Sequence, residues 1–81
     1  MIRLSRVKMN DVKTIFSTRL KALRLEKGLT QQQVGESVGT DKRSVHVWEK
    51  GSSAPSIETF CRLADVLEVD LNFLVGRSDS P

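Results

Sequence analysis

Apolar side chains recur every three or four positions along most of this 81-residue chain, which predicts helices. No alternation of polar and apolar residues is long enough to predict a strand. The first helix is expected over residues 13–27, where an apolar stripe runs up to a terminating Gly28. The stripe consists of Val12, Ile15, Phe16, Leu20 and Leu23. Leu25 lies off this stripe, so we expect its side chain at the surface.

Two short helices are predicted next, and caps mark where they begin. The first covers residues 31–38, where Thr30 and Gln33 form a capping box. The second covers residues 42–50, with Asp41 as its N-cap. Their connection is about three residues long and contains a glycine, which is typical of a helix-turn-helix. The alternative is an ordinary helical hairpin, which would need longer helices to bury itself.

Two further helices follow a loop of small and polar residues. The fourth is expected over residues 57–67 with Ser56 as its N-cap. Its predicted buried stripe consists of Ile57, Phe60, Cys61, Ala64 and Leu67. The fifth is expected over residues 71–75, capped by Asp70, with its apolar side chains turned inward. Those side chains are Leu71 and either Leu74 or Phe73.

The chain is long enough for one small domain with a single core. Residues 12–76 carry the helical pattern and are predicted to form that domain. Residues 1–11 show no clear period and are expected to be a mobile basic arm. The arm is either a disordered start or a segment that reaches along DNA. Residues 77–81 have the composition of a tail or linker.

Composition excludes several classes of protein. A single cysteine cannot form an intrachain disulfide, so a reducing cytoplasm is the expected location. No apolar run approaches the roughly 18–20 residues that span a bilayer, and the N-terminus lacks the apolar core of a signal peptide. The sequence shows no catalytic triad, carboxylate cluster or Gly-rich phosphate loop, and no second histidine could join His46 in a metal site. We therefore expect no enzyme, cofactor, small-molecule ligand or membrane partner.

Charge is distributed unevenly along the chain. The formal net charge is +3, which permits a polyanionic partner but does not prove one. Basic residues crowd the first third of the sequence, and a second group lies mid-chain at Lys42, Arg43 and Lys50. Between Pro55 and Val75 the only cation is Arg62. The N-terminal two-thirds is therefore the predicted electropositive side.

The third predicted helix has two different faces. At 100° per residue, one face spanning about 140° collects Lys42, Arg43, His46, Val47 and Lys50. Val45 and Trp48 fall on the other side and are expected to be buried. Arg and Lys can donate to guanine O6 and N7 in the major groove, and a valine can contact a thymine methyl. The exposed face therefore suits base reading in DNA.

These parts together resemble the Cro/repressor-type, or Xre-like, helix-turn-helix family of phages and bacteria. The resemblance covers roughly residues 16–76 and rests on "LTQ", the glycine turn, "WEKG", "PSIETF" and "LEVDLNFLVG". It implies an all-α, compact five-helix domain with a central helix-turn-helix, like that of lambda repressor. The sequence departs from the family at Gly35, where alanine is usual. Glycine costs about 1 kcal/mol relative to alanine in a helix, and it indicates that another backbone segment passes close by.

The resemblance also implies roles for matched positions. The implied base-reading residues are Lys42, Arg43, His46 and Val47. The implied phosphate-contacting residues are Gln31, Ser44, Lys50, Ser52 and Ser53. Glu49 is implied to pair with Arg24 as part of the structural framework, alongside the buried Val45 and Trp48.

The function that follows is a sequence-specific transcriptional regulator, most simply a repressor. A homodimer is expected to bind a pseudo-palindromic operator in double-stranded DNA, because one small domain reads only a few base pairs. Val66, Leu71 and Phe73 are candidates for the dimer contact, although core packing explains them equally well. The alternatives are an antitoxin, a restriction-modification controller protein, or a protein-interaction module that has lost DNA binding.

Overall fold

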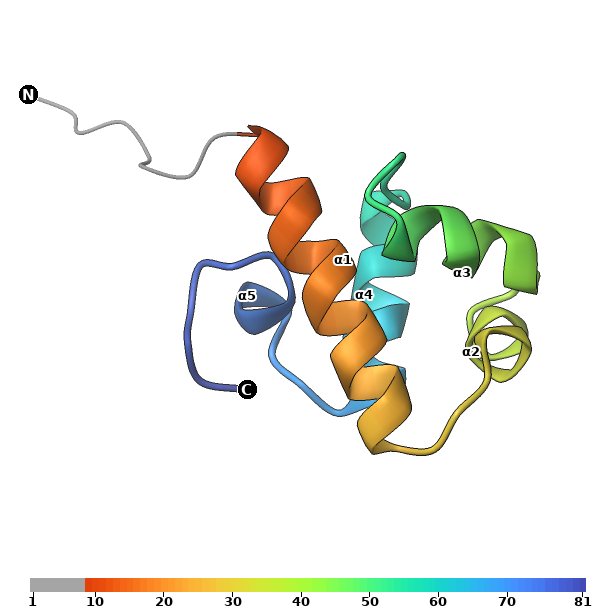
Figure 1. The fold of residues 1–81 in the computed structure, drawn as a ribbon. Helices are drawn as coiled ribbons and strands as arrows, with labels where there is room; N and C mark the ends of the chain where they lie inside the picture. Colours follow the sequence, from red (N-terminus) through yellow and green to blue (C-terminus); the bar gives the residue numbers. More distant parts are fainter. Residues whose placement is uncertain (1–8) are drawn as a thin grey trace, which may run out of the picture.

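The computed structural model describes residues 9–81, and every regular element in that range is an α-helix (Figure 1). The helices are α1 (Met9–Glu26), α2 (Gln31–Ser37), α3 (Lys42–Glu49), α4 (Ile57–Leu67) and α5 (Leu71–Leu74). The predicted all-α fold is confirmed. α1 begins about four residues earlier than expected, so residues 9–11 of the predicted arm belong to it. The remainder of the arm, residues 1–8, lies outside the described residues.

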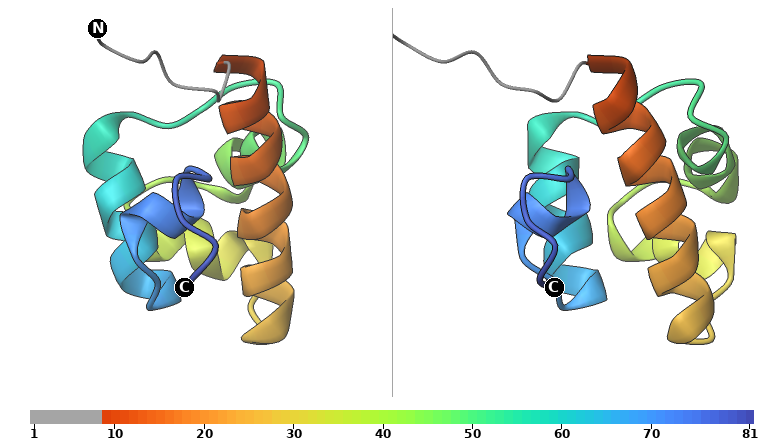
Figure 2. Two further views of the ribbon diagram at one scale, coloured as in Figure 1. Left: turned by 90° about the vertical axis from the view of Figure 1, so that its left-hand side faces the viewer. Right: turned by 60° about the vertical axis from the view of Figure 1, so that its left-hand side comes forward.

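α1 is the central element of the domain. In Figure 1 it crosses the front of the molecule, with α2 and α3 on one side, α5 on the other and α4 behind. The turned views show the segment that joins α3 to α4 running past the N-terminal half of α1 (Figure 2). α2 and α3 are therefore placed together at one side, with the outer surface of α3 uncovered by the other helices.

The predicted caps hold the helix starts. The side chain of Thr30 accepts a hydrogen bond from the backbone N–H of Gln33 at 3.0 Å, and the side chain of Gln33 accepts one from the N–H of Thr30 at 2.8 Å. Asp41 accepts from the N–H of Ser44 at 2.9 Å. Gly39, between the two helices, has a φ of 81°, a left-handed value that residues with a Cβ rarely adopt. The two helices of the motif are thus fixed at their ends by local hydrogen bonds and one glycine.

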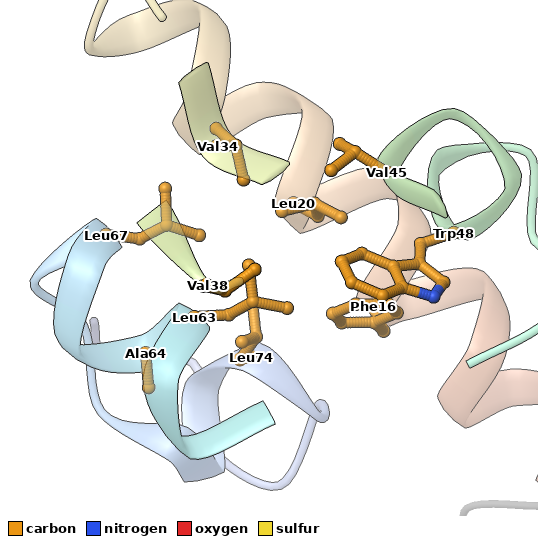
Figure 3. Packing of buried hydrophobic residues seen from close by; sticks show 10 residues of the cluster. All are labelled: Phe16, Leu20, Val34, Val38, Val45, Trp48, Leu63, Ala64, Leu67 and Leu74. Atoms are coloured by element: carbon orange, nitrogen blue, oxygen red, sulfur yellow. The ribbon is translucent and has the colours of Figure 1, made fainter. Parts of the chain in front are cut away.

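A single core joins all five helices (Figure 3). Its buried apolar members are Phe16, Leu20, Val34, Val38, Val45, Trp48, Leu63, Ala64, Leu67 and Leu74. The ring of Phe16 meets the half-buried ring of Phe60 edge to face, with centroids 4.7 Å apart. Val45 and Trp48 are buried as predicted, so the apolar anchors of α3 lie on one side of the helix.

The predicted stripe of α4 is wrong at two positions. Ile57 is 81% exposed and Cys61 is also exposed, whereas Leu63 is fully buried. The true stripe is rotated by about one residue and centres on Phe60, Leu63, Ala64 and Leu67, which follow the helical spacing. Leucine at position 63 buries more apolar surface than cysteine at position 61, so this rotation is the better packing. Cys61 is therefore a surface thiol and not a core residue.

Gly35 is needed by the packing of α2 against the turn. A Cβ built on Gly35 would lie 2.6 Å from the backbone carbonyl carbon and oxygen of Asp41. Contacts under 3.0 Å to backbone atoms cannot be relieved by moving a flexible side chain. The close backbone approach expected from the sequence is confirmed, and the glycine is more than a cost in helix propensity.

We therefore expect Gly35→Ala to destabilise the domain, although glycine-to-alanine changes in helices usually stabilise. The gain of about 1 kcal/mol in helix propensity is outweighed by an overpacking cost of about 2–3 kcal/mol, because the clash is with backbone, for a net loss of about 1–2 kcal/mol. Urea unfolding followed by circular dichroism measures the change. Gly35→Ser should be worse still, because it adds a further atom. An unchanged or raised urea midpoint for Gly35→Ala would show that the backbone at Asp41 can shift to make room for the added methyl group.

The C-terminal segment packs back onto the domain. The guanidinium of Arg19 in α1 donates to the carbonyl of Ser78 at 2.8 Å and lies 4.0 Å from the centre of the Phe73 ring. The backbone N–H of Asp70 donates to the carbonyl of Pro81 at 2.8 Å. Arg19, one of the cations that made the N-terminal third look basic, therefore serves an internal contact. A linker role for residues 77–81 stays a prediction.

Candidate nucleic-acid interface

The outward face of α3 presents the cations that the sequence placed there. Lys42, Arg43, His46 and Lys50 are exposed, while Val45 and Trp48 anchor the opposite side in the core. Val47 is half-buried and lies at the edge of the exposed face. The structure thus exposes four of the five residues predicted for this face of α3, and places Val47 at the edge of that face.

Ser44 lies closer to the turn than to this open face. Its hydroxyl accepts a hydrogen bond from the hydroxyl of Thr40 at 2.9 Å, and its side chain is half-buried. Its backbone N–H is already donated to Asp41. Ser44 therefore has a structural task in the turn, and contact with a phosphate stays a prediction.

The start of α3 is fixed by an ionised cap. The backbone N–H and then the hydroxyl of Ser44 hold the pKa of the Asp41 carboxyl below its ordinary value of 3.8, with a smaller contribution from the charge of Arg43. A carboxylate also suits the positive end of the α3 dipole. The backbone at the start of α3, which carries Lys42 and Arg43, is thereby fixed.

We expect Asp41→Ala to lower the melting temperature, because the N–H of Ser44 loses its acceptor. Folding lowers the pKa of Asp41, so the ionised carboxylate stabilises the folded state. This stabilisation is complete above the unfolded-state pKa near 3.8 and is lost as the pH falls through the folded-state pKa. Asp41→Asn is the matched control, since asparagine caps well but does not titrate. Thermal scans from pH 2 to pH 7 measure this. Equal melting temperatures for the native chain and Asp41→Asn at every pH would contradict it.

The segment after α3 adds exposed hydroxyls beside the cationic face. Ser52 and Ser53 are exposed, and the N–H of Ser52 donates to the carbonyl of Val47 at 3.2 Å. Gly51 has a φ of 76° and packs near Ser17 of α1. This tight exit holds both serines next to the C-terminal end of α3, where the sequence had placed phosphate contacts.

A buried ion pair joins α1 to the end of α3. The guanidinium of Arg24 bonds the Glu49 carboxylate twice, at 2.6 Å and 3.0 Å, and also donates to the carbonyl of Leu29 at 2.9 Å. The two side chains are 11% and 4% exposed. The hydrogen bond to Glu49 raises the pKa of Arg24 above its ordinary value, so the guanidinium stays charged. The predicted pair of Arg24 and Glu49 is confirmed.

Gln31 contacts this pair, which sequence reasoning missed. Its side-chain N–H donates to Oε1 of Glu49 at 3.1 Å. Arg24, Glu49 and Gln31 therefore form one connected set of polar side chains from α1, α3 and α2. The spacing of the three residues in the sequence carries no signal for this contact, because it arises only when folding brings the start of α2 near Glu49.

A shallow cavity of about 320 Å³ lies beside the start of α3. It is lined by Gln32, Glu36, Thr40, Asp41 and Lys42. Two of these side chains are carboxylates, so the cavity itself does not favour a polyanion. Among residues 9–81, no three histidine, cysteine or acidic side chains gather to hold a metal ion. Within the same range, no helix combines the length and apolar character needed to cross a membrane.

A family model described as Helix-turn-helix matches residues 20–74 of this sequence. The chain belongs to the helix-turn-helix family. Its resemblance to the Cro/repressor-type, Xre-like members is confirmed by curated relatives from phages and bacteria. The transcriptional repressor RstR of cryptic phage CTXphi, from Vibrio cholerae, is 33% identical over 82% of this chain and 60% of its own length. The transcriptional regulator YqaE of Bacillus subtilis is 33% identical over 80% of this chain and 57% of its own.

Solved structures agree with the family assignment of this helix-turn-helix chain. The restriction-modification controller protein C.AhdI from Aeromonas hydrophila superposes with a TM-score of 0.71 at 31% identity, over 76% of this chain and 94% of that one. The P22 c2 repressor, solved with a synthetic operator, gives a TM-score of 0.75 at 22% identity, over 79% of this chain and 97% of that one. The latter likeness supports the fold alone. The chain spans about three-fifths of the length of the curated relatives that it matches.

Proposed function

We propose that this helix-turn-helix domain is a sequence-specific DNA-binding transcriptional regulator. One observation carries the proposal: α3 is anchored by Val45 and Trp48 on one side and presents Lys42, Arg43 and His46 on the other. A helix held in this way can enter the major groove while its N-terminal residues contact base edges. RstR and YqaE carry the names of a transcriptional repressor and a transcriptional regulator, which agrees with this function.

In this proposal the predicted DNA-contacting side chains other than Ser44 have separate tasks. Lys42 and Arg43 donate to base edges, and His46 and Val47 contact bases further along the groove. Lys50, Ser52 and Ser53 bind phosphates beside the end of α3, as does Gln31 at the start of α2. The domain regulates by occupying its site, performs no chemistry and needs no cofactor. We place it in the cytoplasm, where bacterial DNA is accessible.

A homodimer on a pseudo-palindromic operator is part of the proposal. Val66 and Leu71 are half-buried and pack against the core, and the Phe73 ring is covered by Arg19. These three candidates for the dimer contact are therefore partly used within the protomer. Exposed apolar surface remains at Ile57, which is 81% exposed. The monomer's weak reading of only a few base pairs is the physical reason to expect two copies.

Selection of bound duplexes from random DNA tests the proposal. We expect enrichment of one pseudo-palindrome whose half-sites are about one helical turn apart, or a multiple of it. The selected site is then sought upstream of the chain's own gene. A pool that stays random after repeated selection would overturn sequence-specific binding, and enrichment of a single half-site would overturn the dimer.

A restriction-modification controller is the second candidate. The 31% identity to C.AhdI, over nearly the whole of that chain, favours it over an antitoxin or a protein-interaction module. A controller and a phage repressor share the DNA-binding step but differ in the genes they regulate. Mapping of bound sites in the native genome separates the two: sites beside restriction and methyltransferase genes favour the controller.

A further inference from the structure

Gln31, in the polar set at the junction of α1, α2 and α3, has a hydrogen-bond donor that its bond to Glu49 does not use. Oε1 of Glu49 accepts from both Arg24, at 3.0 Å, and Gln31, at 3.1 Å. An ionised carboxylate only accepts hydrogen bonds, so the amide of Gln31 must turn its NH₂ group, and not its oxygen, toward Glu49. The orientation of this amide is therefore fixed by the charge of Glu49.

An amide NH₂ group carries two hydrogens in one plane, pointing about 120° apart. One of them is donated to Glu49. Within residues 9–81 no acceptor is found for the other, and Gln31 is half-buried at the first position of α2. The bond to Glu49 thus restrains the amide and leaves its second N–H for a group outside the protein.

Glu49 alone would repel a DNA phosphate from this position. Arg24 removes that obstacle, because its guanidinium makes two hydrogen bonds to the same carboxylate and balances its charge. The pair offers Gln31 an acceptor without presenting a net negative charge to the DNA. Its side chains are nearly buried, so water competes little for these contacts.

We propose that Glu49 is a positioning residue, which aims the second N–H of Gln31 at a phosphate of bound duplex DNA. The inference rests on the proposed DNA-binding function and adds a task to the ion pair beyond joining the helices. Arg24 and Glu49 act through Gln31, which makes the contact. Because Gln31 is neutral, its contribution adds affinity without changing the number of counterions released from the DNA.

A double-mutant cycle on duplex affinity tests the inference, using the duplex selected from random DNA. In the native background, Gln31→Ala should weaken binding about tenfold, the worth of a hydrogen bond to a charged acceptor, and leave the salt dependence unchanged. In the apolar background Arg24→Met/Glu49→Leu, which removes the acceptor of Gln31 without leaving an unpaired charge, the same change should weaken binding by less than about twofold. Gln32→Ala is the matched control, since it changes an adjacent exposed glutamine on the same helix.

Neutral phosphate analogues supply a readout that a structural role would not move. Each phosphate of the selected duplex is replaced singly by an uncharged methylphosphonate. We expect one position per half-site at which Gln31→Ala no longer weakens binding. Equal losses for Gln31→Ala in both backgrounds, or the absence of such a position, would overturn the inference while leaving DNA binding intact. Failure of the native chain to bind any duplex would instead overturn the proposed function.

Discussion

Arg24→Met should lower the free energy of unfolding by about 3–5 kcal/mol, the loss seen when one partner of a buried ion pair is removed. The Glu49 carboxylate would stay in place at 4% exposure with only Gln31 as a donor, and the carbonyl of Leu29 would lose its hydrogen bond. Methionine keeps most of the apolar stem, so the change removes the charge and its hydrogen bonds with little loss of packing. Urea unfolding followed by circular dichroism measures the loss.

The double variant Arg24→Met/Glu49→Leu is the control for this prediction. Replacing both charges by apolar side chains of similar volume is often neutral or stabilising, so most of the lost stability should return. A loss below about 1 kcal/mol for Arg24→Met alone would show that water or another group compensates the carboxylate. A double variant no more stable than Arg24→Met would show that the Leu29 contact, and not the pair, is decisive.

Arg43→Ala should weaken binding to the selected operator by about 1–3 kcal/mol, equivalent to roughly a 5- to 150-fold rise in Kd. Arg43 is exposed near the start of α3, where a side chain reaches base edges. Specificity should relax at one base pair in each half-site and stay intact elsewhere. Competition binding with single-base variants of the operator measures both effects.

Arg77→Ala provides the matched control, because it removes the same charge from an exposed site beyond α5. It should leave base preference unchanged. If Arg43→Ala instead weakens all sequences alike, Arg43 contacts a phosphate and not a base, and base reading must fall to Lys42 or His46.

Local features of the fold were predictable from the sequence. Caps at Thr30 and Asp41 satisfy backbone groups within a few residues, so their chemistry is visible in the sequence and the structure confirms them. The two faces of α3 were predictable for the same reason: helical spacing alone separates Val45 and Trp48 from Lys42 and Arg43. The presentation of the candidate site therefore depends on short-range signals.

Features that depend on neighbouring elements were harder to predict. Periodicity gave the length of α4 but not its rotation, because Ile57, Cys61 and Leu63 can each be placed on an apolar stripe. Gly35 indicated that another backbone segment passes close to α2, but the sequence did not show that this segment is the backbone of Asp41. The bond from Gln31 to Glu49 had no signal in the sequence, since it needs folding to bring the start of α2 near Glu49.

The central claim is that this domain binds DNA by reading its sequence, and the salt dependence of binding to matched and scrambled duplexes tests it most directly. Kd is measured for the selected operator and for a scrambled duplex of the same composition, each at 50 mM and 200 mM salt. The predicted result is a Kd for both duplexes that rises steeply with salt, with the operator bound at least about a thousandfold more tightly at each concentration. Binding that is absent, insensitive to salt, or equal for the two duplexes would contradict it.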